Sequence, residues 1–202
     1  MKRLWLLRHG QTFANIEGRF AGRTAEPLTP EGMKQALEAG ERLREEDISR
    51  IYVSPLKRTI ETARLVVKGL GRKVPIIPEK AFIEINIPAW EGKKKTEIRK
   101  DPELNYEIWT KTPHLFSLPR SETLQEVQER ALKKCLQILE REDCALVVTH
   151  MVVVRVLLCH FLGLGLKAYR SIPVPNATPI LVEPQEEGFR VEAPFDLLSM
   201  AA

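Results

Sequence analysis

The sequence predicts an α/β fold, a three-layer sandwich with a mostly parallel central sheet, helices on both faces and a small irregular and helical lid. Short aliphatic runs alternate with longer amphipathic stretches, which is the pattern of strands joined by crossover helices. The chain has 202 residues and is 44% hydrophobic, so it can bury one sizeable core. We expect a single domain over residues 1–202, with the lid at about residues 85–120, where periodicity fades among tryptophans and prolines.

The first strand and the first helix are expected in the opening quarter of the chain. Residues 4–7 are apolar and form the strand, and a loop rich in Gly and Arg follows over residues 10–28. Thr29 offers an N-cap and Pro30 takes the favoured first helical position. A helix is therefore expected from there to about residue 46.

Two more short strands are expected next, with a helix between them. Residues 51–53 form the second strand, and Ser54 with Pro55 repeats the cap-and-proline signal of a helix that runs through about residue 68. Residues 76–77 are bracketed by prolines and predict a third strand near the edge of the sheet.

The last third of the chain predicts two helices, a buried strand and a hairpin. A capping box of Thr123 and Glu126 opens an amphipathic helix that runs to residue 140. Residues 145–148 are apolar throughout and predict a fully buried strand, which a helix over residues 152–162 follows. The two strands of the expected hairpin are residues 179–182 and 189–192.

Charge and composition limit the classes of partner. The chain carries 31 Lys and Arg against 27 Asp and Glu, and its net charge of +4 suits an anionic small molecule. Nucleic acid is not expected, because the cations are not clustered with interleaved aromatic residues. The scarcity of Asn and Gln beside abundant Glu, Lys, Arg and Pro is a bias associated with thermophilic proteins.

The sequence gives no sign of secretion or of a membrane span. It starts with a strand-like run, and its apolar stretch over residues 144–162 is interrupted by His150, Arg155 and His160. Three cysteines without a Cys-x-x-Cys pair indicate a reduced environment, so we expect a cytoplasmic protein. No metal site is expected, because no Cys/His cluster or His-Glu-x-x-His motif is present.

The residues that follow the expected strands suit phosphate chemistry. Breaking a phosphate monoester requires cations that neutralise charge, a nucleophile in line with the bond, and an acid that protonates the leaving oxygen. Arginine can bind two phosphate oxygens at once, a neutral imidazole is a nucleophile, and a carboxylic acid donates a proton. Candidates for these tasks stand at element ends and are Arg8, His9, Arg58, Glu84 and His150.

These residues belong to motifs whose order along the chain is informative. The motifs are Leu7-Arg8-His9-Gly10-Gln11-Thr12 with Asn15, Pro27-Leu28-Thr29, Ser54-Pro55-Leu56-Lys57-Arg58, Glu84-Ile85-Asn86 before Trp90-Glu91-Gly92, Ser121-Glu122, and Thr149-His150 with Arg155. Together they cover most of the chain and resemble the histidine phosphatase superfamily, in its phosphoglycerate-mutase-like branch.

The resemblance implies a phosphohistidine mechanism that needs no metal or organic cofactor. His9 would attack phosphorus, and Glu84 would protonate the leaving alkoxide and then assist the water that hydrolyses the phosphoenzyme. The residues that would hold the phosphoryl oxygens are Arg8, Arg58 and His150, with Asn15 assisting from its loop. The implied substrate-binding set is Asn15, Gln11, Thr12, Gly22 and Met151.

The chain departs from the family pattern around this site. Met151 replaces the glycine that usually follows the second histidine, and it crowds the pocket while keeping its backbone amide. Ala21, Pro88 and Arg120 stand where the family commonly has a polar residue or glycine. The resemblance therefore does not define which leaving group the site accepts.

The function that we expect is hydrolysis of a small phosphorylated metabolite, a phosphomonoester, with phosphoserine ranked first. A phosphoglycerate mutase is the alternative, but Glu84 is followed within eight residues by Gly92, which leaves no room for the longer insertion usual in mutases. A noncatalytic phosphate-binding scaffold is a third interpretation, and it would not need both a nucleophile and an acid.

Three further features are left with open interpretations. The run of Lys93, Lys94 and Lys95 is either a solvated surface or an attraction for an acidic substrate. The lid and the late hairpin are each candidates for a homodimer contact. Arg155 is expected in a structural salt bridge, and the alternative is that it steadies a loop or a substrate carboxylate.

Overall fold

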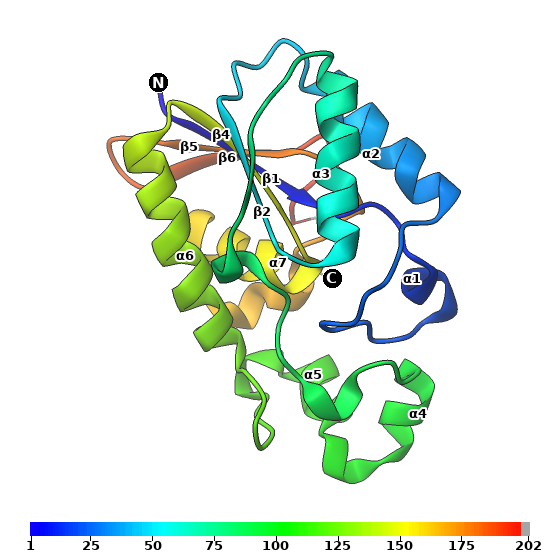
Figure 1. The fold of residues 1–202 in the computed structure, drawn as a ribbon. Helices are drawn as coiled ribbons and strands as arrows, with labels where there is room; N and C mark the ends of the chain where they lie inside the picture. The colour runs from blue at the N-terminus through cyan, green and yellow to red at the C-terminus, as the bar shows by residue number, and fades with distance from the viewer. Residues whose placement is uncertain (199–202) are drawn as a thin grey trace.

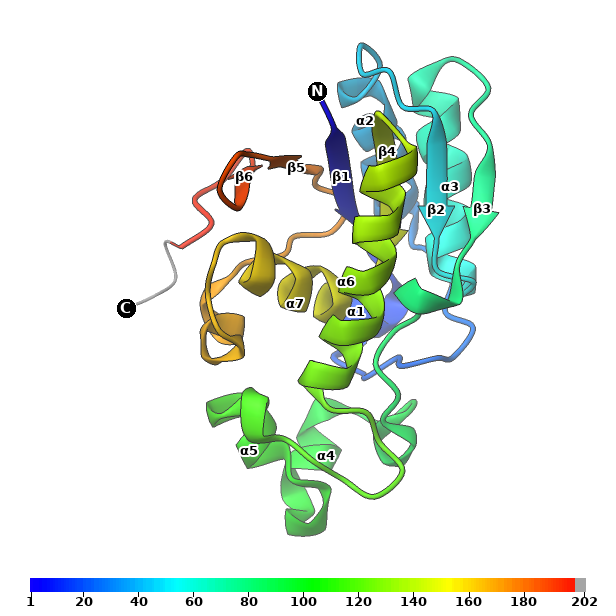
Figure 2. The same ribbon diagram turned by 90° about the vertical axis from the view of Figure 1, so that its left-hand side faces the viewer.

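The computed structural model describes residues 1–198, and their centre is a six-stranded sheet in the order β3-β2-β4-β1-β5-β6 (Figures 1 and 2). The strands are β1 (Arg3–Arg8), β2 (Arg50–Val53), β3 (Ile76–Pro78), β4 (Cys144–Thr149), β5 (Ile180–Pro184) and β6 (Phe189–Glu192). The first four pair in parallel, whereas β5 and β6 form an antiparallel hairpin beside β1. The predicted mostly parallel sheet, its edge strand and its late hairpin are confirmed.

Helices cover both faces of the sheet. α2 (Pro30–Arg42) and α3 (Lys57–Leu70) lie on one face, and α6 (Leu124–Arg141) and α7 (Met151–Phe161) lie on the other (Figure 2). Because side chains alternate along a strand, Ala145 and Val147 of β4 pack in the core with α6 and α7, whereas Leu146 and Val148 pack toward α2 and α3. The predicted three-layer fold is confirmed. Over residues 1–198, no helix combines the length and apolar character that crossing a membrane requires.

A series of short helices connects β3 to α6. They are the 3₁₀ helices Lys80–Phe82, Pro88–Trp90, Pro102–Leu104 and Pro113–Leu115, and the helices α4 (Lys95–Lys100) and α5 (Tyr106–Lys111). α4 and α5 lie at the end of the molecule opposite the N-terminus (Figures 1 and 2). The fully buried Trp90 gives this segment a core, since its ring centroid lies 5.1 Å from that of Phe116 and 5.6 Å from that of Trp109.

The first helix is shorter than the sequence predicted. We expected it to reach residue 46, but α2 ends at Arg42. The following residues turn, and Glu46 forms an ion pair with Arg3 at the start of β1. A contact with a distant strand therefore overrides the local helical pattern.

Two further expectations about local structure were wrong. Ser54 does not cap α3, which begins at Lys57; its hydroxyl instead contacts the ring of His150 inside the protein. The segment over residues 10–28, expected as a loop, contains the short helix α1 (Phe13–Glu17), which Thr12 caps. The Ser54 hydroxyl thus has a partner that is distant in sequence, and the Thr12 hydroxyl has a partner three residues away. The sequence prediction identified neither hydrogen bond.

The loop after β1 is pressed against the first turn of α2. A Cβ built at Gly32 would overlap the backbone carbonyl of Gln11, and a Cβ at Gly10 would overlap the carbonyl of Gly32. The backbone N–H of Thr29 also donates to the Gln11 carbonyl oxygen, at 2.9 Å. Two glycines thus let the loop that carries His9 lie directly on the helix.

We expect Gly32→Ala to lower the free energy of unfolding, although alanine is intrinsically the better helix former by about 1 kcal/mol. The added methyl group must displace the Gln11 backbone, and overpacking of this kind costs about 1–3 kcal/mol. Denaturant unfolding measures the change. Gly165→Ala is the control, because a Cβ there meets no non-neighbouring atom within 4 Å. An equally or more stable Gly32→Ala protein would show that the close approach does not constrain the loop.

Candidate active site

The carboxyl end of β1 and the start of α7, the helix that follows β4, border a cavity of about 140 Å³ beside the short helices α4 and α5. The predicted site residues that line it are Arg8, His9, Thr12, Asn15, Gly22, Arg58, Glu84 and Met151. They come from the end of β1 and its following loop, the start of α3, the segment after β3 and the start of α7. Segments far apart in sequence therefore meet at the carboxyl edge of the parallel strands, where open α/β sheets bind ligands.

His9 presents one free ring nitrogen. The residue is 4% exposed, and its Nδ1 lies 2.7 Å from the carbonyl oxygen of Gly10. A carbonyl oxygen can only accept, so Nδ1 carries the proton and Nε2 keeps its lone pair. Burial lowers the pKa of His9 well below its usual value, and the charges of Arg58 and Arg8 lower it further. The imidazole is therefore neutral at neutral pH and its Nε2 is a nucleophile.

His150 does not line the cavity but packs beside His9. The two ring centroids are 5.5 Å apart, with an angle of 63° between the planes. Its Nε2 lies 2.7 Å from Ser54 Oγ, whereas its buried Nδ1 has no hydrogen-bond partner among residues 1–198. Burial lowers the pKa of His150 well below its usual value, and the charge of Arg58 adds to the effect. The neutral ring thus has one nitrogen engaged by Ser54 and one without a hydrogen-bond partner among the described residues.

Two arginines bring positive charge into the cavity without a direct carboxylate partner among the described residues. Arg8 donates to the carbonyl of Val174 at 2.8 Å, and Arg58 donates to the carbonyls of Gly22 and Thr24. The Nε atom of each guanidinium is buried with no hydrogen-bond partner in residues 1–198. Burial lowers the pKa of Arg8 to about 10, so it remains charged at neutral pH. The half-buried Arg8 and the buried Arg58, both held by backbone carbonyls, favour an anionic ligand.

Glu84 supplies a carboxyl group to the same cavity. It is 8% exposed, and its Oε1 accepts a 2.8 Å hydrogen bond from the backbone N–H of Ile85. Burial raises the pKa of Glu84 above its usual value, while that hydrogen bond and the charge of Arg58 oppose the shift. The raised pKa keeps more of the carboxyl group protonated as neutral pH is approached, which suits a proton donor.

A network that sequence reasoning missed holds the backbone at Glu84. Arg23 Nε and Arg130 Nη2 both donate to the Glu84 carbonyl oxygen, at 3.2 and 3.5 Å. Glu122 joins the two arginines, because its carboxylate accepts from Arg23 at 3.3 Å and from Arg130 at 2.8 Å. Glu122 also accepts from the backbone N–H of Asn86. The Ser-Glu motif drew attention to Glu122. Its partners Arg23 and Arg130 lie 99 and eight residues away in sequence, and no motif connected them to Glu122.

Three of the predicted substrate-binding residues also shape the loop after β1. Thr12 Oγ1 accepts from the backbone N–H of Asn15 at 3.2 Å, and Asn15 Oδ1 accepts from the backbone N–H of Thr12 at 3.0 Å, so the pair caps α1. Gly22 is buried with a φ of 54°, a left-handed conformation that favours glycine, and its carbonyl oxygen accepts from Arg58. Met151 lines the cavity as the first residue of α7.

Gln11 is the predicted binding residue that the structure places outside the cavity lining. Its backbone N–H donates to the Gln35 side chain at 2.9 Å, and its side-chain oxygen accepts from the Thr29 hydroxyl at 3.0 Å. Gln11 therefore ties the loop to α2. Its place in the motif adjacent to His9 gave no indication of which way its side chain points.

Lining residues near the lid were absent from the predicted site. They include Lys95, Tyr106, Trp109 and Arg170. The run of three lysines included Lys95 and was interpreted either as a solvated surface or as an attraction for an acidic substrate. Arg170, in the 3₁₀ helix Leu166–Ser171, lies in a segment to which the sequence assigned no element or role. Arg155, expected in a salt bridge, instead donates to the carbonyl of Ile172 at 2.7 Å.

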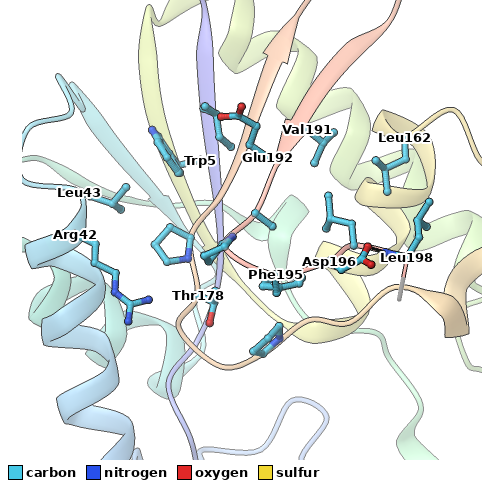
Figure 3. A pocket seen from close by; sticks show the side chains of 16 residues that line it. Trp5, Arg42, Leu43, Leu162, Thr178, Val191, Glu192, Phe195, Asp196 and Leu198 are labelled. Atoms are coloured by element: carbon cyan, nitrogen blue, oxygen red, sulfur yellow. Dashed lines mark hydrogen bonds between the residues drawn. The ribbon is translucent and has the colours of Figure 1, made fainter. Parts of the chain in front are cut away.

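A second cavity is larger, but fewer of its lining side chains can take part in catalysis. It measures about 1100 Å³ and lies between Trp5, the β5–β6 hairpin and residues 193–198 (Figure 3). Its lining is mainly apolar, and the charged side chains in it are those of Arg42, Glu192 and Asp196. Neither a histidine nor a cysteine lines it. Across residues 1–198, no group of three or more His, Cys, Asp or Glu side chains is placed to hold a metal ion. The smaller cavity is therefore the candidate active site.

A neutral imidazole with a fixed tautomer, unpaired arginines and a buried carboxyl group form a site suited to phosphoryl groups. The sequence profile of the histidine phosphatase superfamily (branch 1) matches residues 4–196, and the chain belongs to this family. The resemblance found in the sequence motifs is therefore confirmed.

Relatives with known names or structures cover nearly the whole chain. Phosphoserine phosphatase 1 of Hydrogenobacter thermophilus is 29% identical over 92% of this chain and 88% of that protein. The probable phosphoglycerate mutase GpmB of Klebsiella pneumoniae is 31% identical over 100% of this chain and 96% of that protein. The structure of Bacillus stearothermophilus YhfR superimposes with a TM-score of 0.90 at 32% identity, covering 99% of this chain and 100% of that one.

Proposed function

We propose that the protein is a metal-independent phosphatase that hydrolyses a small phosphomonoester through a phosphohistidine intermediate. The observation that carries the proposal is the hydrogen bond between His9 Nδ1 and the Gly10 carbonyl, which leaves a nucleophilic Nε2 in a cavity that also contains Arg8 and Arg58. A site that only bound phosphate would need the cations but not the oriented nucleophile or the protonated acid.

In the first half of the reaction, the phosphoryl group of the ester is transferred to His9. Arg8 and Arg58 offset the charge of the phosphoryl oxygens, and the free Nδ1 of His150 offers a further contact. As Nε2 of His9 bonds to phosphorus, the bond from phosphorus to the leaving oxygen breaks. The protonated carboxyl group of Glu84 gives its proton to that oxygen, so the alcohol leaves uncharged.

In the second half, water replaces the alcohol. Glu84 is now a carboxylate and accepts a proton from a water molecule as the water oxygen attacks phosphorus. The bond between phosphorus and Nε2 breaks, and its electron pair returns to the imidazole of His9. Inorganic phosphate is released, and Glu84 is again protonated for the next cycle.

The size of the cavity favours a compact substrate. Its volume of about 140 Å³ is well below the roughly 300–1,000 Å³ of pockets that hold drug-sized ligands. Similarity to a phosphoserine phosphatase supports phosphoserine as the first substrate to assay. Similarity to the probable mutase GpmB supports a second candidate, in which the phosphoryl group returns to phosphoglycerate. The products distinguish the two, because only hydrolysis releases inorganic phosphate.

Replacement of the nucleophile tests the proposal. We expect His9→Ala to lower kcat for phosphomonoesters by about 10⁴-fold or more, because no other imidazole within residues 1–198 lines the cavity. Phosphate release from a panel of metabolites, measured with a chelator present, gives the rates. His160→Ala is the matched control, since His160 packs against Phe161 and Phe189 outside the cavity. Wild-type rates from a folded His9→Ala protein would refute the nucleophile assignment.

Replacement of the acid should depend on the leaving group. We expect Glu84→Gln to lower kcat/KM for an alkyl phosphate by about 10²- to 10⁴-fold, the usual contribution of general acid catalysis. The loss for 4-nitrophenyl phosphate should be much smaller, because that leaving group departs readily as an anion. Glu79→Gln is the control, since Glu79 pairs with Lys134 outside the cavity. Equal losses for the two esters would contradict the acid role of Glu84.

A further inference from the structure

The cavity contains more positive charge than one phosphoryl group requires. Besides Arg8 and Arg58, the side chains of Lys95 and Arg170 line it. Lys95 is the first residue of α4, and Arg170 lies in the 3₁₀ helix Leu166–Ser171. Both residues are exposed, in contrast to the buried Arg58. They therefore mark the part of the cavity wall that is nearer to solvent, on the side of α4 and α5.

Arg170 is held in place without a carboxylate. Its guanidinium donates to the carbonyl oxygen of Trp109, with Nε at 3.2 Å. The guanidinium carbon also lies 5.7 Å from the ring centroid of Trp109 and 5.9 Å from that of Tyr169. These contacts fix the side chain and leave its charge uncompensated by any described acidic residue.

Lys95 lines the cavity near other cations, and its side chain forms no ion pair with a described carboxylate. Partial desolvation against the cavity wall lowers the pKa of Lys95 from its usual value, and the nearby charges of Arg8, Arg170 and Arg155 lower it further. The backbone N–H of Lys95 donates to the Gly18 carbonyl oxygen at 2.9 Å, which fixes the start of α4 over the cavity. Gathering like charges costs free energy, and an anion bound among them would recover it.

We propose that Lys95 and Arg170 form a second anion site, which binds an acidic group on the leaving alcohol while Arg8 and Arg58 hold the transferred phosphoryl group. The preferred substrates are then phosphomonoesters whose alcohol carries a carboxylate or a second phosphate. This inference rests on the proposed function for its biological meaning. The affinity of the cavity for a second anion can nevertheless be measured in the absence of turnover. Lys95 and Arg170 are specificity residues and take no part in bond breaking.

Matched ligands isolate the second anion. Phosphoglycolate carries a carboxylate, 2-hydroxyethyl phosphate replaces that carboxylate with a hydroxymethyl group, and 1,3-propanediol bisphosphate carries a second phosphate. Calorimetric titration in a His9→Ala background avoids turnover. We expect the two anionic ligands to bind about 10- to 100-fold more tightly than 2-hydroxyethyl phosphate, as for charge-assisted hydrogen bonds. The larger preference identifies the anion that the site is built for.

Variants then assign the preference to its residues. We expect Lys95→Met and Arg170→Met, each in the His9→Ala background, to lower the preference about tenfold or more while leaving the affinity for 2-hydroxyethyl phosphate within about threefold. Lys93→Met is the matched control, because Lys93 belongs to the same run but does not line the cavity. Equal affinities for all three ligands, or a preference that survives both Lys95→Met and Arg170→Met, would overturn the inference.

Turnover separates this inference from the proposed function. With His9 present, Lys95→Met should raise KM for phosphoglycolate by a larger factor than KM for 4-nitrophenyl phosphate, since the second ester has no second anion. A wild-type protein that binds the anionic ligands selectively but hydrolyses no ester would support the second anion site and refute the phosphatase. A protein that hydrolyses 4-nitrophenyl phosphate but binds the anionic ligands no more tightly than 2-hydroxyethyl phosphate would support the phosphatase and refute the second anion site.

Discussion

His9 donates its Nδ1 proton to the carbonyl oxygen of Gly10, and the reactivity of the whole site depends on this hydrogen bond. With the proton on Nε2 instead, the nitrogen that is free of protein contacts would have no lone pair for phosphorus. The carbonyl is in place because its loop is fixed from two sides: the Gly10 N–H donates to Thr62 Oγ1 at 3.1 Å, and Asn176 donates to the His9 carbonyl at 3.0 Å. Backbone geometry therefore sets the tautomer, without a carboxylate partner.

Desolvation then sets the protonation states. It lowers the pKa values of His9 and His150 and raises that of Glu84, so one cause leaves the histidines neutral and favours the protonated acid. Desolvation also makes Arg8 and Arg58 costly to keep charged, because backbone carbonyls are their partners and no carboxylate pairs with them among the described residues. A dianionic ester offsets that cost on binding. The arrangement is thus poised for phosphate, because neither Arg8 nor Arg58 forms an ion pair with a carboxylate within the described residues.

Sequence patterns predicted the parts of this site that depend on local structure. Apolar runs located β1 and β4, and the polar residues at their exits, Arg8, His9 and His150, meet as parallel strands require. Contacts that packing creates could not be read in the same way. Three features depend on elements that approach only in the folded chain. They are the hydrogen bonds of Arg23 and Arg130 to the backbone of Glu84, the position of Arg170, and the contact of Gln11 with Thr29 at the start of α2. The lysine run is an example, since the sequence drew attention to Lys95 but could not predict that its side chain lines the cavity.

The phosphoryl group on His9 can be observed directly. Rapid mixing with 4-nitrophenyl phosphate labelled at phosphorus, followed by an alkaline quench that preserves phosphohistidine, allows the labelled peptide to be found by mass spectrometry. The account predicts that the label appears on His9 at Nε2 before inorganic phosphate is released, and that it decays at the rate of turnover. Steady hydrolysis with no label on the chain, or with the label on another residue, would contradict it.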